Sequence, residues 1–141
     1  MYHRILIPVD GSEHTSHAVR HAINIASFSN GYAVIHLVHA YERIPSLIGG
    51  EEREDLKHDI VDESHKMFQE HIDIFEQYMI ENKIHIVEGD PETVINNICK
   101  KENCDIIIMG TRGLSGVQGA LMGSVATKVI HNSSVPVLVI K

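Results

Sequence analysis

Residues 105–124 read DIIIMGTRGLSGVQGALMGS, a buried strand followed by a long glycine-rich loop. The apolar run 106–109 shows no polar alternation, as expected of a central parallel strand covered on both faces. Five glycines fall between positions 110 and 123, and Ser124 opens a helical pattern that runs to His131. A strand that leads through a loop into a helix is typical of α/β proteins with a parallel sheet.

The rest of the chain repeats this alternation of strands and helices. We expect strands over 3–9, 32–40, 84–88, 105–109 and 135–140, and helices over 13–29, 52–82, from Asp90 onward, and over 124–131. Such alternation implies right-handed crossovers and a parallel sheet with helices on both faces. The 141 residues, 43% of them hydrophobic, suffice for one core. We therefore predict a single Rossmann-like α/β domain over residues 1–141.

The glycine-rich loop is the candidate binding site. Ligands of parallel sheets bind beyond the carboxyl ends of the strands, where the strand order reverses. With the first strand central, that crevice lies between Asp10 and Gly110. Glycines let main-chain N–H groups approach a ligand, and the helix start at Ser124 favours a phosphate. Arg112 and Lys128 are candidate charge partners, and a merely flexible loop is the alternative.

Two familiar nucleotide motifs are absent from the sequence. There is no G-x4-G-K-[ST], which excludes a P-loop, and no G-x-G-x-x-G after the first strand, which excludes the dinucleotide fingerprint. At the first turn, Ser12 is placed to cap the following helix through its side-chain oxygen.

The spacing Gly110-x2-Gly113-x9-Gly123-Ser124 matches the pattern G-x2-G-x9-G-[ST]. On this motif the chain resembles the ATP-binding branch of the universal stress protein family. The segments ILIPVDGSEHTSHAV (5–19), VIHLVHAY (34–41), MGTRG (109–113) and SSVPVLVIK (133–141) are similar to the family's first strand and turn, second strand, fourth-strand exit and last strand. The resemblance implies a five-stranded parallel sheet of order 3-2-1-4-5.

The resemblance further implies that the ligand is ATP. Asp10 and the main chain at Val38 would lie by the adenine. From the residues themselves, Asp10 could help hold Mg²⁺ or orient a water, and the Ser124 hydroxyl could donate to a phosphate oxygen or help hold a metal-bound water. The loop glycines and Ser124 would surround the ribose and the phosphates. The nucleotide-binding residues expected on this basis are Pro8, Val9, Asp10, Val38, Met109, Gly110, Arg112, Gly113, Gly123, Ser124 and Val125.

The last strand is the expected dimer contact, because the family that the chain resembles pairs through it. The resemblance implies a homodimer formed by Val135, Val137, Leu138 and Val139. An apolar edge strand would otherwise invite aggregation. The alternative, that the strand only completes the core, is compatible with pairing.

The expected function is that of a nucleotide-dependent regulatory module of the stress response, acting as a dimer. No evident general base accompanies Asp10, and the loop carries no catalytic lysine, so dedicated catalysis is not expected. Two alternatives stay open: a slow ATP hydrolase, and a dimeric interaction protein whose pocket is empty.

Composition excludes several other classes. The net charge is −7, and Lys100 and Lys101 are the only adjacent basic residues, which argues against nucleic-acid binding. No stretch approaches the ~20 apolar residues of a membrane span, and the N-terminal apolar run is too short for a signal peptide. The expected location is the cytoplasm, with Cys99 and Cys104 as reduced thiols.

Eleven histidines are many for this length. His14, His17 and His21 follow helical spacing and could form a metal site or a solvated face. His36 and His39 lie in one strand and are expected on opposite faces of the sheet. One of them could form a hydrogen bond near the ligand, and the alternative is that both are interior histidines with satisfied hydrogen bonds.

Overall fold

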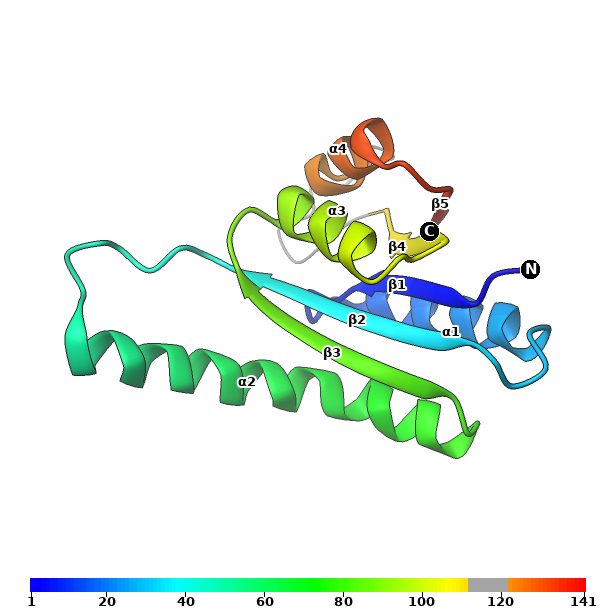
Figure 1. The fold of residues 1–141 in the computed structure, drawn as a ribbon, viewed down its shortest axis with the longest axis horizontal. Helices are drawn as coiled ribbons and strands as arrows, with labels where there is room; N and C mark the ends of the chain where they lie inside the picture. The colour runs from blue at the N-terminus through cyan, green and yellow to red at the C-terminus, as the bar shows by residue number, and fades with distance from the viewer. Residues whose placement is uncertain (112–121) are drawn as a thin grey trace.

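The structure, a computed structural model, describes residues 1–111 and 122–141. These residues form a five-stranded parallel sheet of order β3-β2-β1-β4-β5 with helices on both faces (Figure 1). The predicted fold class and strand order are therefore confirmed. The elements are β1 (Arg4–Pro8), α1 (Glu13–Ser27), β2 (Val34–Tyr41), α2 (Gly50–Gln77), β3 (Glu81–Glu88), α3 (Pro91–Lys101), β4 (Ile106–Gly110), α4 (Ser124–Asn132) and β5 (Val137–Ile140).

Two hydrophobic cores lie on the two faces of the sheet, and they follow from the alternation of side chains along each strand. Ile5 and Ile7 of β1 face α1 and α2, where they pack with Phe68 and Phe75. Leu6 faces the other way and packs with residues of α3 and α4. In Figure 1, α3 and α4 lie above the strands, α2 lies below them, and α1 lies behind β1 and β2.

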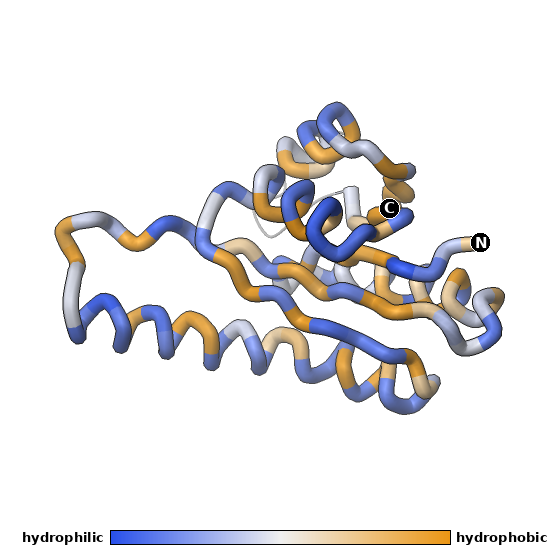
Figure 2. Tube along the Cα trace, in the orientation of Figure 1, coloured by the Kyte–Doolittle hydropathy of each residue, from blue (hydrophilic) through white to orange (hydrophobic). Residues whose placement is uncertain are grey.

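Strand β4 is central and apolar throughout, as its sequence predicted. Ile106 and Ile108 join the core under α1 and α2, whereas Ile107 and Met109 join the core under α3 and α4. Figure 2 shows hydrophobic colour along the strands, with bands of hydrophobic and hydrophilic residues alternating along α2. None of the helices in the described ranges is long and apolar enough to cross a bilayer.

Helix α2 ends at Gln77, so the predicted end near residue 82 was wrong. The N–H of Ile80 donates to the carbonyl of Phe75 at 2.9 Å, and that of Met79 to Glu76 at 3.0 Å. With Met79 at a φ of 55°, this is a Schellman ending, in which a left-handed residue stops the helix. Glycine is the usual residue at this position, so a methionine there carries no stop signal in the sequence, and the side chain of Met79 is 89% exposed.

The strand starts also differ from the predicted ones by one to three residues, and the reason can be given for β3 and β5. Strand β3 begins at Glu81 rather than Ile84, because residues 81–88 pair with β2 along their whole length. Strand β5 begins at Val137 rather than Val135. The hydroxyl of Ser133 donates to the carbonyl of Val135 at 2.8 Å and accepts from the N–H of Val135 at 3.1 Å, which holds Val135 in a turn.

Candidate functional site

The carboxyl ends of β1 and β4 lie side by side in the centre of the sheet. Ile5 pairs with Ile106 and Leu6 with Ile107, so the segments that leave these strands emerge together. The chain leaves β1 toward β2 on one side, while β4 connects to β5 on the other. This is the reversal of strand order at which parallel sheets bind ligands, and it is where the sequence placed the crevice.

Asp10 is held in a fixed position directly after β1. Its Oδ1 accepts a hydrogen bond from the N–H of Ser12 at 2.9 Å and from the hydroxyl of Thr15 at 3.2 Å. Gly11, with a φ of 80°, provides the left-handed turn between Asp10 and Ser12. The carboxylate therefore lies at the start of α1, where the helix dipole favours a negative charge.

The Ser12 side chain does not cap α1, contrary to the prediction. Its Oγ is buried and, like the buried Nδ1 of His14, has no hydrogen-bond partner among the described residues. Most buried polar atoms in proteins have such a partner. Two unpaired polar atoms beside the fixed carboxylate of Asp10 leave hydrogen-bonding capacity for a polar ligand at this end of the sheet.

The exit of β4 and the start of α4 meet at Thr111 and Gly123. The N–H of Gly123 donates to the carbonyl of Thr111 at 2.6 Å, and the N–H of Thr111 donates to Ile140 of β5 at 2.9 Å. Gly123 is the N-cap of α4, and Ser124 is its first residue. The first N–H groups of an α-helix have no partner within the helix and can bind an anion. Arg112 and Gly113 lie outside the described residues.

Lys128 forms an ion pair with a residue of α3, and its role as a charge partner at the loop stays a prediction. Its Nζ lies 3.4 Å from Oε1 of Glu92, at the start of α3. A hydrogen bond from its own main-chain N–H, and then the contact with Lys128, lower the pKa of Glu92. The carboxylate thus stays charged and holds Lys128 on the side of α3.

Strand β2 borders the site next to β1. The N–H of Val9 donates to the carbonyl of Val38 at 2.8 Å, so this carbonyl, which the resemblance would place by an adenine, is already engaged in the sheet. A carbonyl oxygen has a second lone pair. The pairing of β1 with β2 ends at Pro8 and Val38, and β2 continues to Tyr41. Ala40 therefore lies beyond the end of β1, on the edge that faces the site.

His39 joins β2 to the end of β1 through its Nδ1, which lies 2.8 Å from the carbonyl oxygen of Val9. His36 contacts His85 instead, on the α3 face of the sheet. The two histidines thus lie on opposite faces of β2, as their spacing predicted. On α1, the rings of His14 and His17 meet edge to face with centroids 6.2 Å apart.

Strand β5 forms one edge of the sheet, and its residues are half-buried. Val137 packs against the core under α3 and α4, and so does Val135, which precedes the strand. Leu138 packs against the core under α1 and α2. Val139 belongs to neither core cluster of the described residues, so among the four predicted dimer residues it is the one least engaged within the chain.

Sequence reasoning missed Thr15, His14 and Thr111 at this site. Thr15 lies five residues after Asp10, which is one turn into α1, and its hydroxyl reaches back to the carboxylate. The spacing Asp-Gly-Ser-x-x-Thr could have indicated this contact. Thr111 acts through its main chain, and main-chain roles leave little trace in a single sequence.

Comparison with known proteins places the chain in a family. The sequence matches the universal stress protein family over residues 1–141. It is 34% identical to universal stress protein MJ0531 of Methanocaldococcus jannaschii over 100% of this chain and 83% of that protein. It is 31% identical to universal stress protein MJ0577 of the same organism, over 100% of this chain and 96% of that one, and the solved structure of MJ0577 superposes with a TM-score of 0.85.

A more distant structure agrees in fold. The universal stress protein from Archaeoglobus fulgidus in complex with dAMP is 24% identical and has a TM-score of 0.73, with 99% of this chain and 98% of that chain covered. At this identity the likeness concerns the fold alone. The match of the family over the full length, together with the two relatives above 30% identity, shows that this chain belongs to the universal stress protein family.

Proposed function

We propose that this protein binds an adenine nucleotide, with ATP as the expected ligand, at the carboxyl ends of β1 and β4. The observation that carries the proposal is the contact between Thr111 and Gly123, which brings the start of α4 to the end of β4 beside Asp10. The proposal is also supported by the dAMP bound to the relative from A. fulgidus.

The division of the nucleotide along the site follows the resemblance to the family and is part of the proposal. Pro8, Val9 and Asp10, with the edge of β2 at Val38 and Ala40, form the side that takes the adenine. Met109 and Gly110 lead to the ribose, with the loop residues Arg112 and Gly113. Ser124 and Val125 offer the N–H groups of the helix start to the phosphates, and Gly123, whose own N–H is bonded to Thr111, leaves room for them because it has no side chain.

Magnesium would accompany a bound triphosphate, and the oxygen atoms at hand suit it. Mg²⁺ prefers hard oxygen ligands and usually keeps several waters while it binds one or two carboxylates and phosphate oxygens. The described hydrogen bonds of Asp10 both use Oδ1, which leaves Oδ2 for such a contact. The hydroxyl of Ser124 is the second candidate, directly or through water.

The proposed role is regulatory, in a homodimer that reports nucleotide occupancy in the stress response. A second copy would add to the sheet at β5, its apolar edge strand, which supports pairing because exposed strand edges otherwise attract aggregation. A cytoplasmic location is supported by the two cysteines, which are free thiols, as is usual in reducing compartments.

Isothermal titration calorimetry with ATP, ADP and dAMP, each with and without Mg²⁺, tests the proposal. We expect one adenine nucleotide per chain, with ATP tightest when Mg²⁺ is present. No saturable binding of any adenine nucleotide at millimolar concentration would contradict it and would favour an interaction protein with an empty pocket. Release of phosphate from radiolabelled ATP, above that of a Gly123→Val control, would instead indicate a slow hydrolase.

A further inference from the structure

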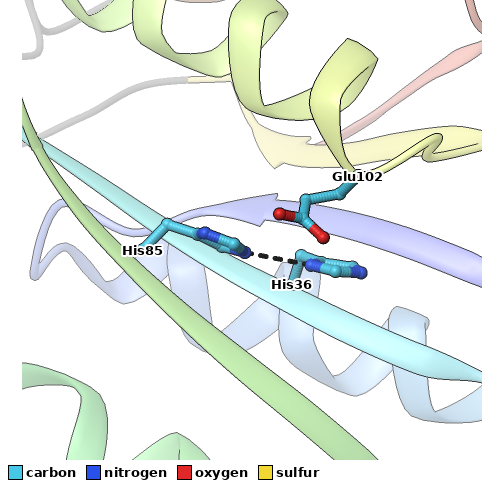
Figure 3. Close-up of side chains that lie close together, drawn as sticks. All are labelled: His36, His85 and Glu102. Atoms are coloured by element: carbon cyan, nitrogen blue, oxygen red, sulfur yellow. Dashed lines mark hydrogen bonds between the residues drawn. The ribbon is translucent and has the colours of Figure 1, made fainter.

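A cluster of three side chains, none of them among the residues assigned to the nucleotide, lies on the α3 face of the sheet. His36 comes from β2, His85 from β3, and Glu102 from the end of α3 (Figure 3). One potential ligand atom from each residue lies within 4.8 Å of the other two. Glu102 precedes β4 and so lies near the start of that strand, whereas His85 lies in the middle of β3, where it pairs with Val38.

The two imidazoles face each other nitrogen to nitrogen. Nδ1 of His36 lies 3.0 Å from Nε2 of His85, and the ring planes are inclined by only 21°. Such a contact requires one nitrogen to donate a proton and the other to accept it, so at least one ring is neutral. Burial is the main cause that lowers the pKa of both histidines, which keeps the pair neutral at physiological pH.

His36 is 2% exposed, while His85 and Glu102 are half-buried. One ring of the cluster, that of His36, is therefore buried in the interior, while the other two side chains are partly open to solvent. A small cation can reach the cluster from the side of His85 and Glu102 without unfolding the sheet. Figure 3 shows the carboxylate of Glu102 directed toward the two rings.

We propose that His36, His85 and Glu102 form a binding site for a divalent transition-metal ion of the Zn²⁺ type. Zinc binds neutral imidazole nitrogens and carboxylate oxygens, and two nitrogens at ~2.0–2.1 Å from a tetrahedral zinc lie about 3.3 Å apart. The observed separation of 3.0 Å is close to that value, so the metal replaces the shared proton with a small opening of the pair. Two histidines and one carboxylate leave a fourth position for water.

The charges around the cluster set a limit on its affinity. The negative charge of Glu102 raises the pKa of both histidines. The positive charges around them lower it: Lys83 acts on both rings, Arg4 on His36 and Lys101 on His85. These cations oppose a dication, so we expect affinity in the micromolar range. Bound metal would join β2 and β3 to the end of α3 and so stabilise the fold.

Other histidines of the described residues are a competing source of zinc binding. His58 lies 3.5 Å from Asp62 on the exposed side of α2, and both side chains are mostly solvated. Exposed pairs of this kind bind zinc weakly and are the natural control. The variant His58→Gln removes a surface histidine and leaves the cluster intact.

The experiment titrates untagged, EDTA-treated and dialysed protein with ZnCl₂, without nucleotide, and compares wild type with His85→Gln, Glu102→Gln and His58→Gln. Changes outside the ligand shell typically cost about 10–100-fold in metal affinity, so loss of a ligand is expected to weaken the tightest site by at least about tenfold. His58→Gln should bind as wild type does. Zinc should also raise the melting temperature of wild type and of His58→Gln, but not of the two cluster variants.

Cobalt provides a readout that does not depend on stability. Wild type and His58→Gln with one equivalent of Co²⁺ should show the visible absorption of a low-coordinate cobalt ion, and His85→Gln should lose it. Equal zinc affinity in wild type, His85→Gln and Glu102→Gln would overturn the proposal, as would the absence of a stoichiometric site in wild type. Circular dichroism verifies that each variant is folded, and the two cluster variants avoid the fully buried His36.

Discussion

The main-chain N–H of Gly123 donates a hydrogen bond to the carbonyl oxygen of Thr111 at 2.6 Å, which joins the exit of β4 to the start of α4. Thr111 is in turn bonded to Ile140 of β5 at 2.9 Å. These two main-chain hydrogen bonds fix the first turn of α4 relative to the sheet. The proposed phosphate contacts at Ser124 and Val125 depend on this position.

Replacing Gly123 by valine is expected to weaken ATP binding by at least about tenfold, which corresponds to ~1.4 kcal/mol. Gly123 has a φ of −62°, which any residue adopts, so the loss would come from a side chain in the space proposed for phosphate and not from backbone strain. Gly49→Val is the matched control, because a Cβ at Gly49 meets no atom within 4 Å. Calorimetric titration measures both, and equal affinities would count against the assignment of the loop.

The variant Asp10→Asn is expected to weaken nucleotide binding less than Gly123→Val and to reduce its dependence on Mg²⁺. The amide keeps the size of the side chain but removes the charge that Ser12 and Thr15 hold in place. We also expect a loss of about 1 kcal/mol in unfolding free energy, since a charged acceptor becomes neutral. Titrations with and without Mg²⁺ measure the effect, with exposed Asp59→Asn as control. An unchanged response to Mg²⁺ would exclude Asp10 from a metal contact.

We expect His71 to contribute to an acid sensitivity of the fold, to which His36 and His85, whose pKa burial also lowers, add their own part. Burial lowers the pKa of His71 from the ordinary 6.5, with Glu70 opposing, and its Nδ1 has no partner within the described part of the chain. Below pH 6.5 the unfolded chain binds a proton at this histidine, whereas the folded chain binds it only at lower pH. As the pH is lowered, the free energy of unfolding therefore decreases by up to ~1.4 kcal/mol per pH unit from this group.

The variant His71→Leu should therefore gain unfolding free energy over wild type, and this gain should be larger at pH 5 than at pH 8. Urea unfolding at the two pH values measures the difference. His65→Leu, on the exposed side of the same helix, should leave the pH dependence as it is. A wild-type pH dependence in His71→Leu would show that this histidine does not cause the acid sensitivity.

If the protein forms the proposed dimer through β5, a charge at Val139 should shift it toward the monomer. Val139 is on the edge strand and lies outside both core clusters of the described residues, so Val139→Asp spares the packing that Val137 provides. Sedimentation velocity measures the distribution. Leu47→Asp, at a position 98% exposed, is the control for added charge. A dimer that persists in Val139→Asp would argue against pairing through β5.

The order and type of the elements could be predicted because apolar periodicity records them. The run at 106–109 was recognised as a central strand, and its side chains do divide between the two cores. The end of α2 and the start of β3 could not be predicted, because the helix stops at Met79 without a glycine and β3 opens with the polar residues Glu81, Asn82 and Lys83.

The position of the candidate site could be predicted from strand order, but its hydrogen bonds could not. The contacts of Asp10 with Thr15, and of Thr111 with Gly123, depend on how the turns after β1 and β4 close. The cluster of His36, His85 and Glu102 was missed because its members are far apart in sequence. Only the pairing of β2 with β3 and the end of α3 bring them together.

Nuclear magnetic resonance of the ¹⁵N-labelled protein during titration with ATP and Mg²⁺ tests the central claim most directly. We predict saturable shifts of the main-chain amides of Asp10, Ser12, Thr111, Gly123, Ser124 and Val125, with the amides of His85 and Glu102 unaffected. Saturable shifts confined to another part of the protein, or none at millimolar ATP, would contradict a nucleotide site at the ends of β1 and β4.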